Sequence, residues 1–395
     1  MKTHLRTAAV ALLVLGAVLV GWLRPSGGSA LTDPKIQVGS SPEIVFDWNR
    51  DACSPTEQPD LPARAFRDAR GRVQLLISHY DSYRMVGRTL GRVHPDCHPL
   101  MRSPEDPDPS RYRDRRWLGS PFTYDGRHVW ALVHHEYQGN RHPGHCPERS
   151  YYPCWYNALT LASSSDGGRT YRQAAAPRQF VAGAPYRYRH GIGPVGVFAP
   201  SNLVKRGRYL YALVRVRDPG RPRGACLIRS PAISKPGSWR AWDGDRFAIA
   251  FTEPYRSPTR PYVGCEPISP GEISEMTESL TFNTALDRYL LVGIAGPVNV
   301  DGRRQRERGI YFSLSEDLVH WSPRKLVLAS PTLHSYRCGG TSPIAYPSLI
   351  DPDSRSRTFG ITGRHPFLYF TKFRYRNCQK TVNRDLMRVR LDVAG

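Results

Sequence analysis

The sequence lacks several patterns that would identify common enzyme chemistries. No two cysteines have the C-x-x-C spacing of a zinc ribbon or a thioredoxin-like site. No G-x-x-x-x-G-K-[ST] nucleotide-binding loop and no G-x-S-x-G nucleophile elbow occur, which argues against phosphoryl transfer and esterase chemistry. Beyond residue 23 the chain contains neither an apolar run long enough to cross a bilayer nor a long amphipathic helical pattern. These absences leave a strand-rich protein whose chemistry is none of those named above.

The N-terminal segment holds the one long apolar run. Two basic residues precede an uninterrupted apolar stretch at 8–23, and small residues follow at 28–30. The stretch is long for a secretory signal and short for a spanning helix, so a cleaved signal peptide and an uncleaved membrane anchor both stay open. In either case we expect residues 1–30 to direct export. Residues 31–395 are then a single domain that is periplasmic, secreted or anchored facing outward.

All eight cysteines follow that segment, and an even number in an exported chain indicates disulfide bonds. Pairing of neighbours along the chain is one of many connectivities that this count allows. It suits a fold built from sequential units. The four neighbouring pairs are 53–97, 146–154, 226–265 and 338–378.

The chain is strongly basic, with a formal net charge of +22 from 56 lysines and arginines against 34 aspartates and glutamates. Only seven of the basic residues are lysines, and the arginines are scattered rather than gathered in the stripes of a nucleic-acid-binding protein. For an exported protein, attraction to an acidic polysaccharide or an anionic cell surface explains the positive charge better than binding to DNA does. We expect no nucleic-acid partner, and no membrane contact beyond the N-terminal segment. A merely solvated basic surface is the alternative.

A pattern of two short strands joined by a turn occurs five times along the chain. Each copy has a small residue near its start, and three copies place a glycine six residues later, as a tight hairpin turn favours. The copies are 62–78, 118–134, 199–215, 277–293 and 345–362, with Ala65, Ser120, Ser201, Ser279 and Ser348 at the equivalent place and Gly71, Gly126 and Gly207 in the turns.

The spacing of these copies, roughly 55–80 residues, leaves room for four strands in each, which is the size of a propeller blade. Small residues at the start of the first strand fit innermost strands, because those strands converge on a crowded axis. We predict an all-β fold, namely a five-bladed β-propeller with four-stranded antiparallel blades. A β-sandwich with coincidental hairpins is the alternative.

Two short motifs resemble those of known propeller enzymes. The stretch SSDGGRTY at 164–171 resembles the Asp-box of sialidase-type propellers, an outer structural turn. The stretch SLSEDLVHW at 313–321 looks like the S-x-D-x-x-x-W strand ends of five-bladed glycosidases. Over most of residues 45–390 the pattern is similar to the arabinanase/levansucrase/invertase-type group. The resemblance implies a carbohydrate-active enzyme, a glycoside hydrolase acting on a poly- or oligosaccharide, without indicating a single family.

In such propellers, residues just before each first strand and just after each second strand gather on the substrate-binding face. The stretch RHVWALVHHEYQGN at 127–140 ends an apolar strand in two histidines, a glutamate and a tyrosine, which this mapping places at the central pocket. Trp117, just before a first strand, is best placed to stack on a sugar ring. The residues expected to contact substrate are Arg64, His79, Asp81, Trp117, His135, Tyr137, His190 and Arg217.

The resemblance also implies a set of catalytic carboxylates. One carboxylate activates water or attacks the anomeric carbon, and another protonates the leaving oxygen. Asp60 is the closest match for the first role, with Asp47 and Asp81 as rivals, and Glu278 is the candidate acid. Glu136 is the rival acid, or the third carboxylate that tunes the pKa of the acid. No cofactor is expected.

Two other functions fit the same chain. A lyase acting on a uronate polymer would use histidine, tyrosine and arginine. His79, His134, His135, His190 and Tyr137 could supply these together with the many arginines. A non-catalytic carbohydrate-binding propeller would need none of them for chemistry. Adjacent strand residues point to opposite faces, so His134 and His135 do not suit one shared metal ion. We predict no catalytic metal, leave a structural calcium ion open, and expect a monomer.

Overall fold

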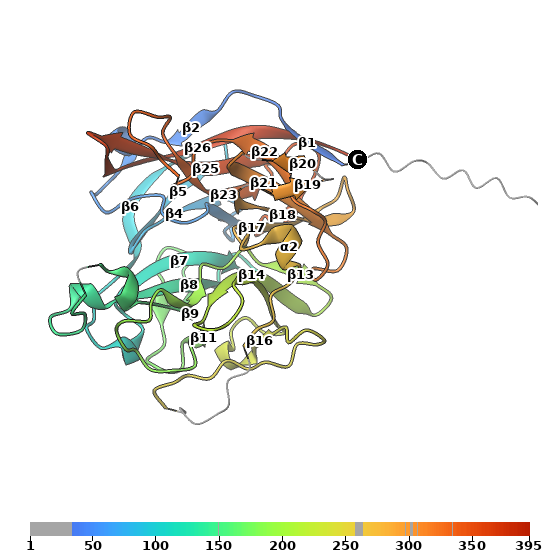
Figure 1. Ribbon diagram of the computed structural model, residues 1–395. Coiled ribbons are helices and arrows are strands. Elements are labelled where there is room, and N and C mark those ends of the chain that lie inside the picture. Colours follow the sequence, from blue (N-terminus) through green and yellow to red (C-terminus); the bar gives the residue numbers. More distant parts are fainter. Residues whose placement is uncertain are drawn as a thin grey trace, which may run out of the picture. The chain divides into compact units, whose positions relative to one another are not determined.

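The structure is a computed structural model that describes residues 34–148, 150–256, 264–296, 298–300, 303–305, 307–333 and 335–395. From Pro34 to Gly395 the chain forms one compact unit (Figure 1). The predicted export segment at 1–30 lies outside the described residues. Within them, no helix is long and apolar enough to cross a membrane.

Strands make up nearly all of the regular structure in the described part of the chain. The two α-helices, α1 (Trp48–Asp51) and α2 (Pro270–Ile273), are single turns. The short 3-10 segments are η1 (Pro109–Arg111), η2 (Gly139–Arg141), η3 (Tyr152–Cys154) and η4 (Pro236–Ser238). The fold is therefore all-β, as the alternation of apolar and polar residues predicts.

The first repeat copy belongs to a four-stranded antiparallel sheet in sequence order. Its strands are β3 (Arg64–Arg67), β4 (Val73–Ser78), β5 (Asp81–Gly87) and β6 (Val93–Arg102). Gly71, in the turn between β3 and β4, has φ 76°, a conformation that glycine adopts without strain. This sheet has the strand number and order that the sequence predicts for one unit.

The second and third copies share one ten-stranded sheet instead of forming the two separate four-stranded sheets that we expected. They join where β12 pairs in parallel with β9. Gly196 permits this close approach, because a Cβ atom there would lie 2.0 Å from the carbonyl oxygen of Asn157. The strands are β7 (Arg115–Phe122), β8 (Val129–Gln138), β9 (Trp155–Ser164), β10 (Arg172–Gln173), β11 (Phe180–Gly183), β12 (Val195–Phe198), β13 (Val204–Arg206), β14 (Tyr209–Arg217), β15 (Gly224–Ser230) and β16 (Arg240–Ala241).

The fourth copy contributes an antiparallel sheet in the order β22-β21-β18-β17, to which β24 adds in parallel with β17. A separate hairpin of β19 and β20 lies between β18 and β21 in the sequence. The strands are β17 (Ser279–Asn283), β18 (Arg288–Ala295), β19 (Val298–Val300), β20 (Arg303–Gln305), β21 (Gly309–Ser315), β22 (Lys325–Ala329) and β24 (Ile361–Thr362).

The fifth sheet contains strands from both ends of the described chain. β23 pairs with β25 and β25 with β26, while β1 and β2 pair with β26 from the N-terminal side. The predicted second strand of the fifth copy is wrong, because β24 pairs with β17 of the fourth sheet and β25 is the true partner of β23. The strands are β1 (Lys35–Val38), β2 (Glu43–Phe46), β23 (Ile344–Ile350), β25 (Phe367–Arg376) and β26 (Gln379–Ala394).

Hydrogen bonds near the predicted small residues join each repeat copy to the next. All five small residues are buried, as the convergence of the first strands requires. The last bond in the series joins the fifth copy back to the first. The bonds run from Ser78 Oγ to the Leu118 carbonyl (2.5 Å), from Ser120 Oγ to the Ser201 carbonyl, from Leu280 N to Asn202 Oδ1 (2.8 Å), from Leu349 N to Ser279 Oγ (2.9 Å) and from Ser348 Oγ to the Ala63 carbonyl (2.6 Å).

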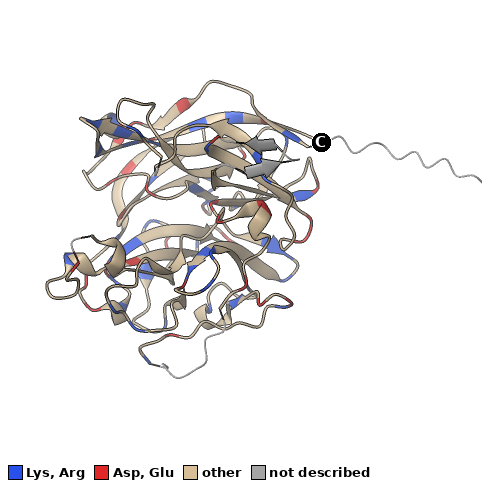
Figure 2. Ribbon diagram, in the orientation of Figure 1, with Lys and Arg blue, Asp and Glu red and all other residues tan. Residues whose placement is uncertain are grey.

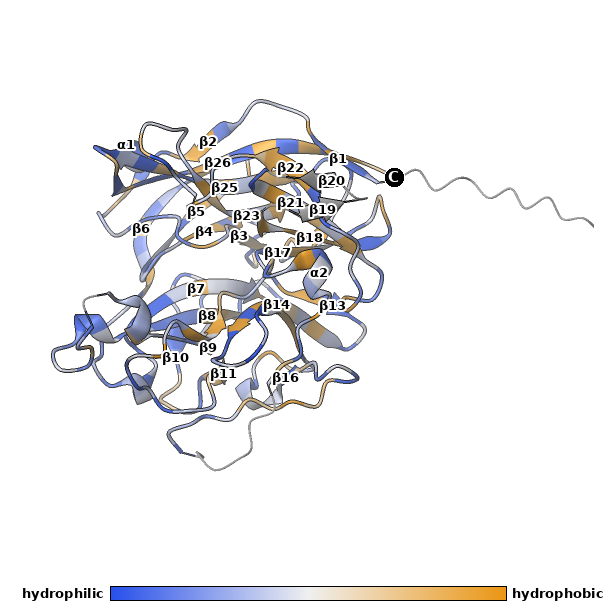
Figure 3. Ribbon diagram, viewed as in Figure 1, coloured by the Kyte–Doolittle hydropathy of each residue, from blue (hydrophilic) through white to orange (hydrophobic). Residues whose placement is uncertain are grey.

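The strands carry most of the apolar residues, and the turns carry most of the polar ones (Figure 3). The four disulfide bonds join 53–97, 146–154, 226–265 and 338–378, which confirms the neighbouring pairing. The Asp-box is a structural turn, as its resemblance implies, because Asp166 accepts hydrogen bonds from the backbone of Arg169 and Thr170. Lysines and arginines lie in all parts of the fold (Figure 2).

Candidate active site

The HHEY stretch at the end of β8 divides between the two faces of its sheet. His134 Nε2 lies 3.0 Å from Glu136 Oε1, and Gln138 Nε2 donates to Glu136 Oε2 at 2.6 Å. His135 and Tyr137 point to the opposite face, as alternate residues of a strand do, and line a different pocket. One strand therefore supplies a carboxylate to one group of residues and aromatic rings to another.

Asp60 accepts hydrogen bonds or an ion pair from three side chains and lies close to a fourth. Its Oδ1 accepts from the Tyr346 hydroxyl at 3.1 Å and pairs with the Arg384 guanidinium. Its Oδ2 accepts from Trp117 Nε1 at 3.2 Å and lies 3.5 Å from His79 Nε2. Burial alone would raise the pKa of Asp60, but the charge of Arg384 and the bond from Tyr346 help to lower it overall. Asp60 is therefore held as a carboxylate.

His79 is held neutral beside this carboxylate. Its Nδ1 lies 3.0 Å from the carbonyl oxygen of Thr56, so Nδ1 carries the proton and donates it. Burial lowers the pKa of His79 to about 4, although the charge of Asp60 opposes the shift. With the proton on Nδ1, the neutral ring presents Nε2 as an acceptor, and its approach to Asp60 adds no ion pair.

Tyr346 reaches Asp60 from a distorted part of β23. The pairing of β23 with β25 shifts register between Ala345 and Ser348, and Tyr346 has φ 56°, a left-handed conformation that non-glycine residues seldom adopt. Burial and the charge of Asp60 raise the pKa of Tyr346 well above its usual value, so the hydroxyl stays protonated and donates. Backbone strain held in place by neighbouring contacts is typical of functional sites.

Glu278 directly precedes β17 and lies near Arg215 at the end of β14. Its Oε2 accepts from the backbone N of Thr277 at 3.0 Å. Burial raises the pKa of Glu278, although the charge of Arg215 opposes the shift. The carboxyl group of Glu278 thus holds its proton more tightly than a free glutamic acid does, as suits a general acid.

Electrostatic interactions connect the surroundings of Asp60 with those of Glu278. The Tyr346 hydroxyl donates to Asp60 and lies within electrostatic range of Arg215. Arg215 in turn acts on Glu278, and the charge of Glu136 contributes to the raised pKa of Tyr346. Asp60 and Glu136 therefore share Tyr346 as a neighbour, and Arg215 links Tyr346 to Glu278.

His134 joins the same set through Trp117. The two residues pair across β7 and β8, and their ring centres are 5.6 Å apart. We refer to the whole set as the central cluster, which consists of Asp60, His79, Trp117, His134, Glu136, Arg215, Glu278, Tyr346 and Arg384.

Sequence analysis missed Tyr346 and Arg384. The Tyr-Pro pair directly before Ser348 interrupts an otherwise regular strand, and that was the available signal for Tyr346. Arg384 lies on β26, the last strand of its sheet, whereas the mapping considered only the first two strands of each copy.

Several predicted contact residues have partners in the structure. Arg64 is buried, and its guanidinium donates to Ser348 Oγ at 2.9 Å and to the Glu278 carbonyl, so it joins sheets where their first strands converge. Asp81 accepts from Thr56 Oγ1 at 3.1 Å and does not contact Asp60 in the described structure. These two residues therefore have structural partners and stay outside the central cluster.

Trp117 and Arg217 differ in position from what we expected. Trp117 is only 4% exposed, and its ring meets His79 and Tyr80 edge-on, so it offers little open face for a sugar. Its contribution to the site is the bond to Asp60. Arg217 pairs with Glu275 at 3.0 Å, beyond Arg215 on the same strand.

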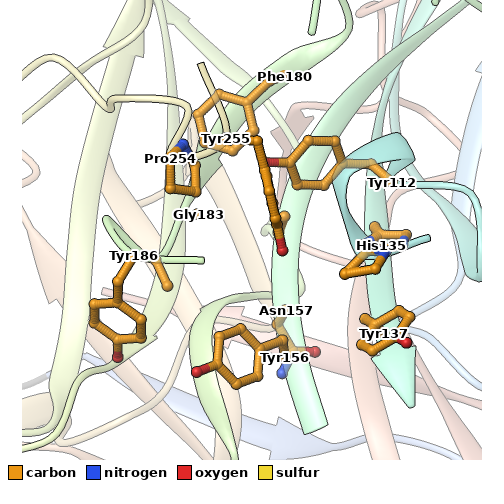
Figure 4. Close-up of a pocket in the computed structure, with 13 residues that line it drawn as sticks. Tyr112, His135, Tyr137, Tyr156, Asn157, Phe180, Gly183, Tyr186, Pro254 and Tyr255 are labelled. Atoms are coloured by element: carbon orange, nitrogen blue, oxygen red, sulfur yellow. The ribbon is translucent and has the colours of Figure 1, made fainter. Parts of the chain in front are cut away.

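The other face of β8 lines a pocket of aromatic rings (Figure 4). Tyr137 is 1% exposed, and its hydroxyl donates to the Pro107 carbonyl at 2.9 Å. Burial lowers the pKa of His135 well below its usual value, so this ring is neutral. The structure does not bring His135 and Tyr137 to Asp60, contrary to the sequence mapping. We call this site the aromatic pocket, and its rings are Tyr112, His135, Tyr137, Tyr156, Phe180, Tyr186 and Tyr255.

One group in the described residues has the spacing of metal ligands, namely Cys146, Glu148 and Cys154, whose ligand atoms lie within 4.8 Å of one another. The two cysteines are joined in a disulfide, so neither offers a thiolate. Glu148 instead lies 2.9 Å from Nδ1 of His190, so the partner of His190 is in this loop and not in the central cluster. The structural calcium ion stays a prediction.

The fold is similar to that of a solved glycosyl hydrolase. No protein-family model matches the chain, and no curated protein matches its sequence. Among solved structures, a glycosyl hydrolase from Bacteroides ovatus matches with a TM-score of 0.50 and 9% identity, covering 90% of this chain and 93% of that chain. The fold resemblance that the sequence motifs predicted is confirmed. At this identity the match gives the fold alone, and the activity must be argued from the site.

Two arabinofuranosidases are also similar in structure. The catalytic domain of a GH62 α-L-arabinofuranosidase from Coprinopsis cinerea matches with a TM-score of 0.47 and 12% identity, covering 88% of this chain and 95% of that chain. An α-L-arabinofuranosidase from Podospora anserina, solved in complex with cellotriose, matches with a TM-score of 0.45 and 8% identity, covering 89% and 95%.

Proposed function

We propose that this protein is an exported glycoside hydrolase on a five-bladed β-propeller, which cleaves a poly- or oligosaccharide with Asp60 and Glu278. Five blades are supported by the bonds that join successive repeat copies, since the last of them runs from Ser348 back to Ala63 of the first copy. Pairing of β1 and β2 with β26 supports closure of the ring in the same way. The four disulfides support export.

The observation that carries the proposal is that the surroundings of the two carboxyl groups shift their pKa values in opposite directions. Arg384 and Tyr346 help to hold the pKa of Asp60 below its usual value, while burial holds the pKa of Glu278 above its usual value. Two carboxyl groups whose surroundings separate their pKa values in this way can act as an acid and as its charged partner. Glycoside hydrolysis requires that combination.

Each group then has a defined part in the reaction. Glu278 donates its proton to the glycosidic oxygen as the bond to the anomeric carbon breaks. Asp60 stays charged, stabilises the oxocarbenium-like sugar, and either attacks the anomeric carbon or orients the water that does so. Glu136, held by His134 and Gln138, is the third carboxyl group, whose negative charge acts on Tyr346 and tunes the site.

A direct test is the Glu278→Gln variant assayed on arabinan, xylan and acidic polysaccharides by release of reducing ends. We expect turnover to fall by about 10²–10⁴-fold, because the proton donor is lost, while substrate binding is retained. Glu316→Gln is the matched control, because Glu316 is an exposed glutamate at the end of β21 that pairs only with Arg288 among the described residues. Its turnover should equal that of the wild type.

Other outcomes of the same assay would overturn the proposal. Unsaturated products that absorb in the ultraviolet, formed only from uronate polymers, would indicate a lyase. Binding without turnover, unchanged in Glu278→Gln, would indicate a non-catalytic carbohydrate-binding protein.

A further inference from the structure

Among the described residues, none accepts a hydrogen bond from the charged guanidinium of Arg215. Arg215 lies near the end of β14 with its guanidinium 5.1 Å above the ring of Phe198. Its Nε atom is buried and has no hydrogen-bond acceptor, and no described residue forms an ion pair with its guanidinium. A partly buried cation without a counter-charge is costly, so the arrangement calls for an anion from elsewhere.

The other arginines around the central cluster are occupied. Arg384 pairs with Asp60, Arg217 pairs with Glu275 at 3.0 Å, and Arg64 donates to carbonyl groups and to Ser348. These three have structural partners that fix them. Arg217 and Arg384 also have a buried Nε without an acceptor, but Arg215 differs from them because no described residue accepts a hydrogen bond from any part of its guanidinium.

Two acidic side chains, Glu278 and Glu275, act on the charge of Arg215 without forming an ion pair with it in the described structure. Burial raises the pKa of Glu278, which weakens it as a counter-charge, and its Oε2 accepts from the Thr277 backbone. Glu275 pairs with Arg217. A ligand carboxylate would therefore meet an arginine that no described carboxylate pairs with directly.

We propose that Arg215 binds the carboxylate of a uronic-acid residue, so that the substrate of the central cluster is an acidic glycan. A guanidinium offers two parallel N–H donors that match a carboxylate. The net charge of +22 agrees with this substrate class, because a basic protein attracts an acidic polymer over a distance. The proposal rests on the hydrolase function above and adds its substrate class.

The test measures binding of acidic oligosaccharides against their own neutral forms. Oligogalacturonate, oligoalginate and a glucuronoxylan oligosaccharide are each compared with the carboxyl-reduced form, by calorimetry on the full-length protein. We expect at least one acidic form to bind at least about tenfold more tightly than its reduced form. Arg215→Gln should remove most of that difference, and Arg215→Lys should restore only part of it.

Arg229→Gln is the matched control, because Arg229 is a half-buried arginine of the same sheet that lies over Tyr209 and Phe247, away from the central cluster. It should keep the full preference. Equal binding of acidic and reduced forms, or an unchanged preference in Arg215→Gln, overturns the proposal. Tighter binding of a sulfated oligosaccharide than of all three carboxylated ones overturns the carboxylate as the ligand.

Failure of this inference is distinguishable from failure of the hydrolase function. Hydrolysis of neutral glycans that Arg215→Gln leaves unchanged would keep the hydrolase and discard the acidic substrate. An Arg215-dependent preference for carboxylates without any hydrolysis would keep the anion site and discard the hydrolase.

Discussion

The two faces of strand β8 are equally buried but opposite in chemistry. On one face, Glu136 is 9% exposed and belongs to the central cluster, where charged and hydrogen-bonded groups meet. On the other face, His135 is 2% exposed and belongs to the aromatic pocket, where rings such as Tyr112 and Phe180 pack with their centres 5.3 Å apart. Four consecutive polar or aromatic residues therefore serve two different sites.

The difference shows how position in a strand decides chemistry. The central cluster keeps Asp60 charged with Arg384 and Tyr346, so its energy depends on ion pairing and hydrogen bonding. The aromatic pocket keeps His135 neutral and depends mainly on packing. A substitution should therefore affect activity on the first face and stability on the second.

The largest effect that separates the two faces is expected from Glu136→Gln. This change removes the negative charge of Glu136 from the central cluster while keeping the shape of the side chain. We expect kcat to fall by about 10- to 100-fold, because the proton affinities of the neighbouring groups are no longer tuned by this charge. Initial rates on the best polysaccharide substrate measure it.

Glu253→Gln is the corresponding change on the opposite face, where Glu253 accepts from the Tyr112 hydroxyl at 2.6 Å. It should leave kcat unchanged. If both variants lose activity to the same extent, the two faces do not have separate functions and the comparison fails.

The fold was largely predictable because its repeated structural units produce a repeated pattern in the sequence. Buried small residues recur at the predicted places, and the four disulfides join neighbours along the chain. Two points were not predictable from local patterns. The parallel pairing of β12 with β9 joins segments of different copies, and β24 resembles a strand of its own copy but pairs with β17.

The candidate site was predictable only in part. Asp60, Glu136 and Glu278 could be proposed from their places before or after strands, and the structure groups their surroundings. Arg384 could not, because it comes from a distant strand and meets Asp60 only through folding. Tyr346 depends on a bulge, which shifts the register by an amount that alternation alone does not indicate.

A smaller effect is expected from Tyr346→Phe, which tests how the central cluster keeps Asp60 charged. The Tyr346 hydroxyl donates to Asp60 at 3.1 Å and favours the carboxylate form, so its loss raises the pKa of Asp60. Activity that requires charged Asp60 disappears as pH falls through that pKa. The acid limb of the kcat/KM profile should therefore move to higher pH, with a loss of only a few-fold at the optimum.

The matched control is Tyr369→Phe, because Tyr369 lies on the neighbouring strand β25 and its hydroxyl is buried away from Asp60. Its acid limb should coincide with that of the wild type. An acid limb that stays in place in Tyr346→Phe would show that Asp60 does not control the rate.

The smallest effect is expected from Tyr255→Phe in the aromatic pocket. The Tyr255 hydroxyl accepts from the backbone N of Tyr188 at 3.0 Å, and removing it costs about 1 kcal/mol of unfolding free energy. For a domain of this size we expect a decrease in Tm of about 2 °C or less, measured by calorimetry. The kcat, the KM and the acid limb should all stay at wild-type values, because the ring remains and no group of the central cluster changes. A loss of activity without a loss of stability would instead show that the aromatic pocket takes part in the reaction. The two faces of β8 would then differ in their residue types but not in their function.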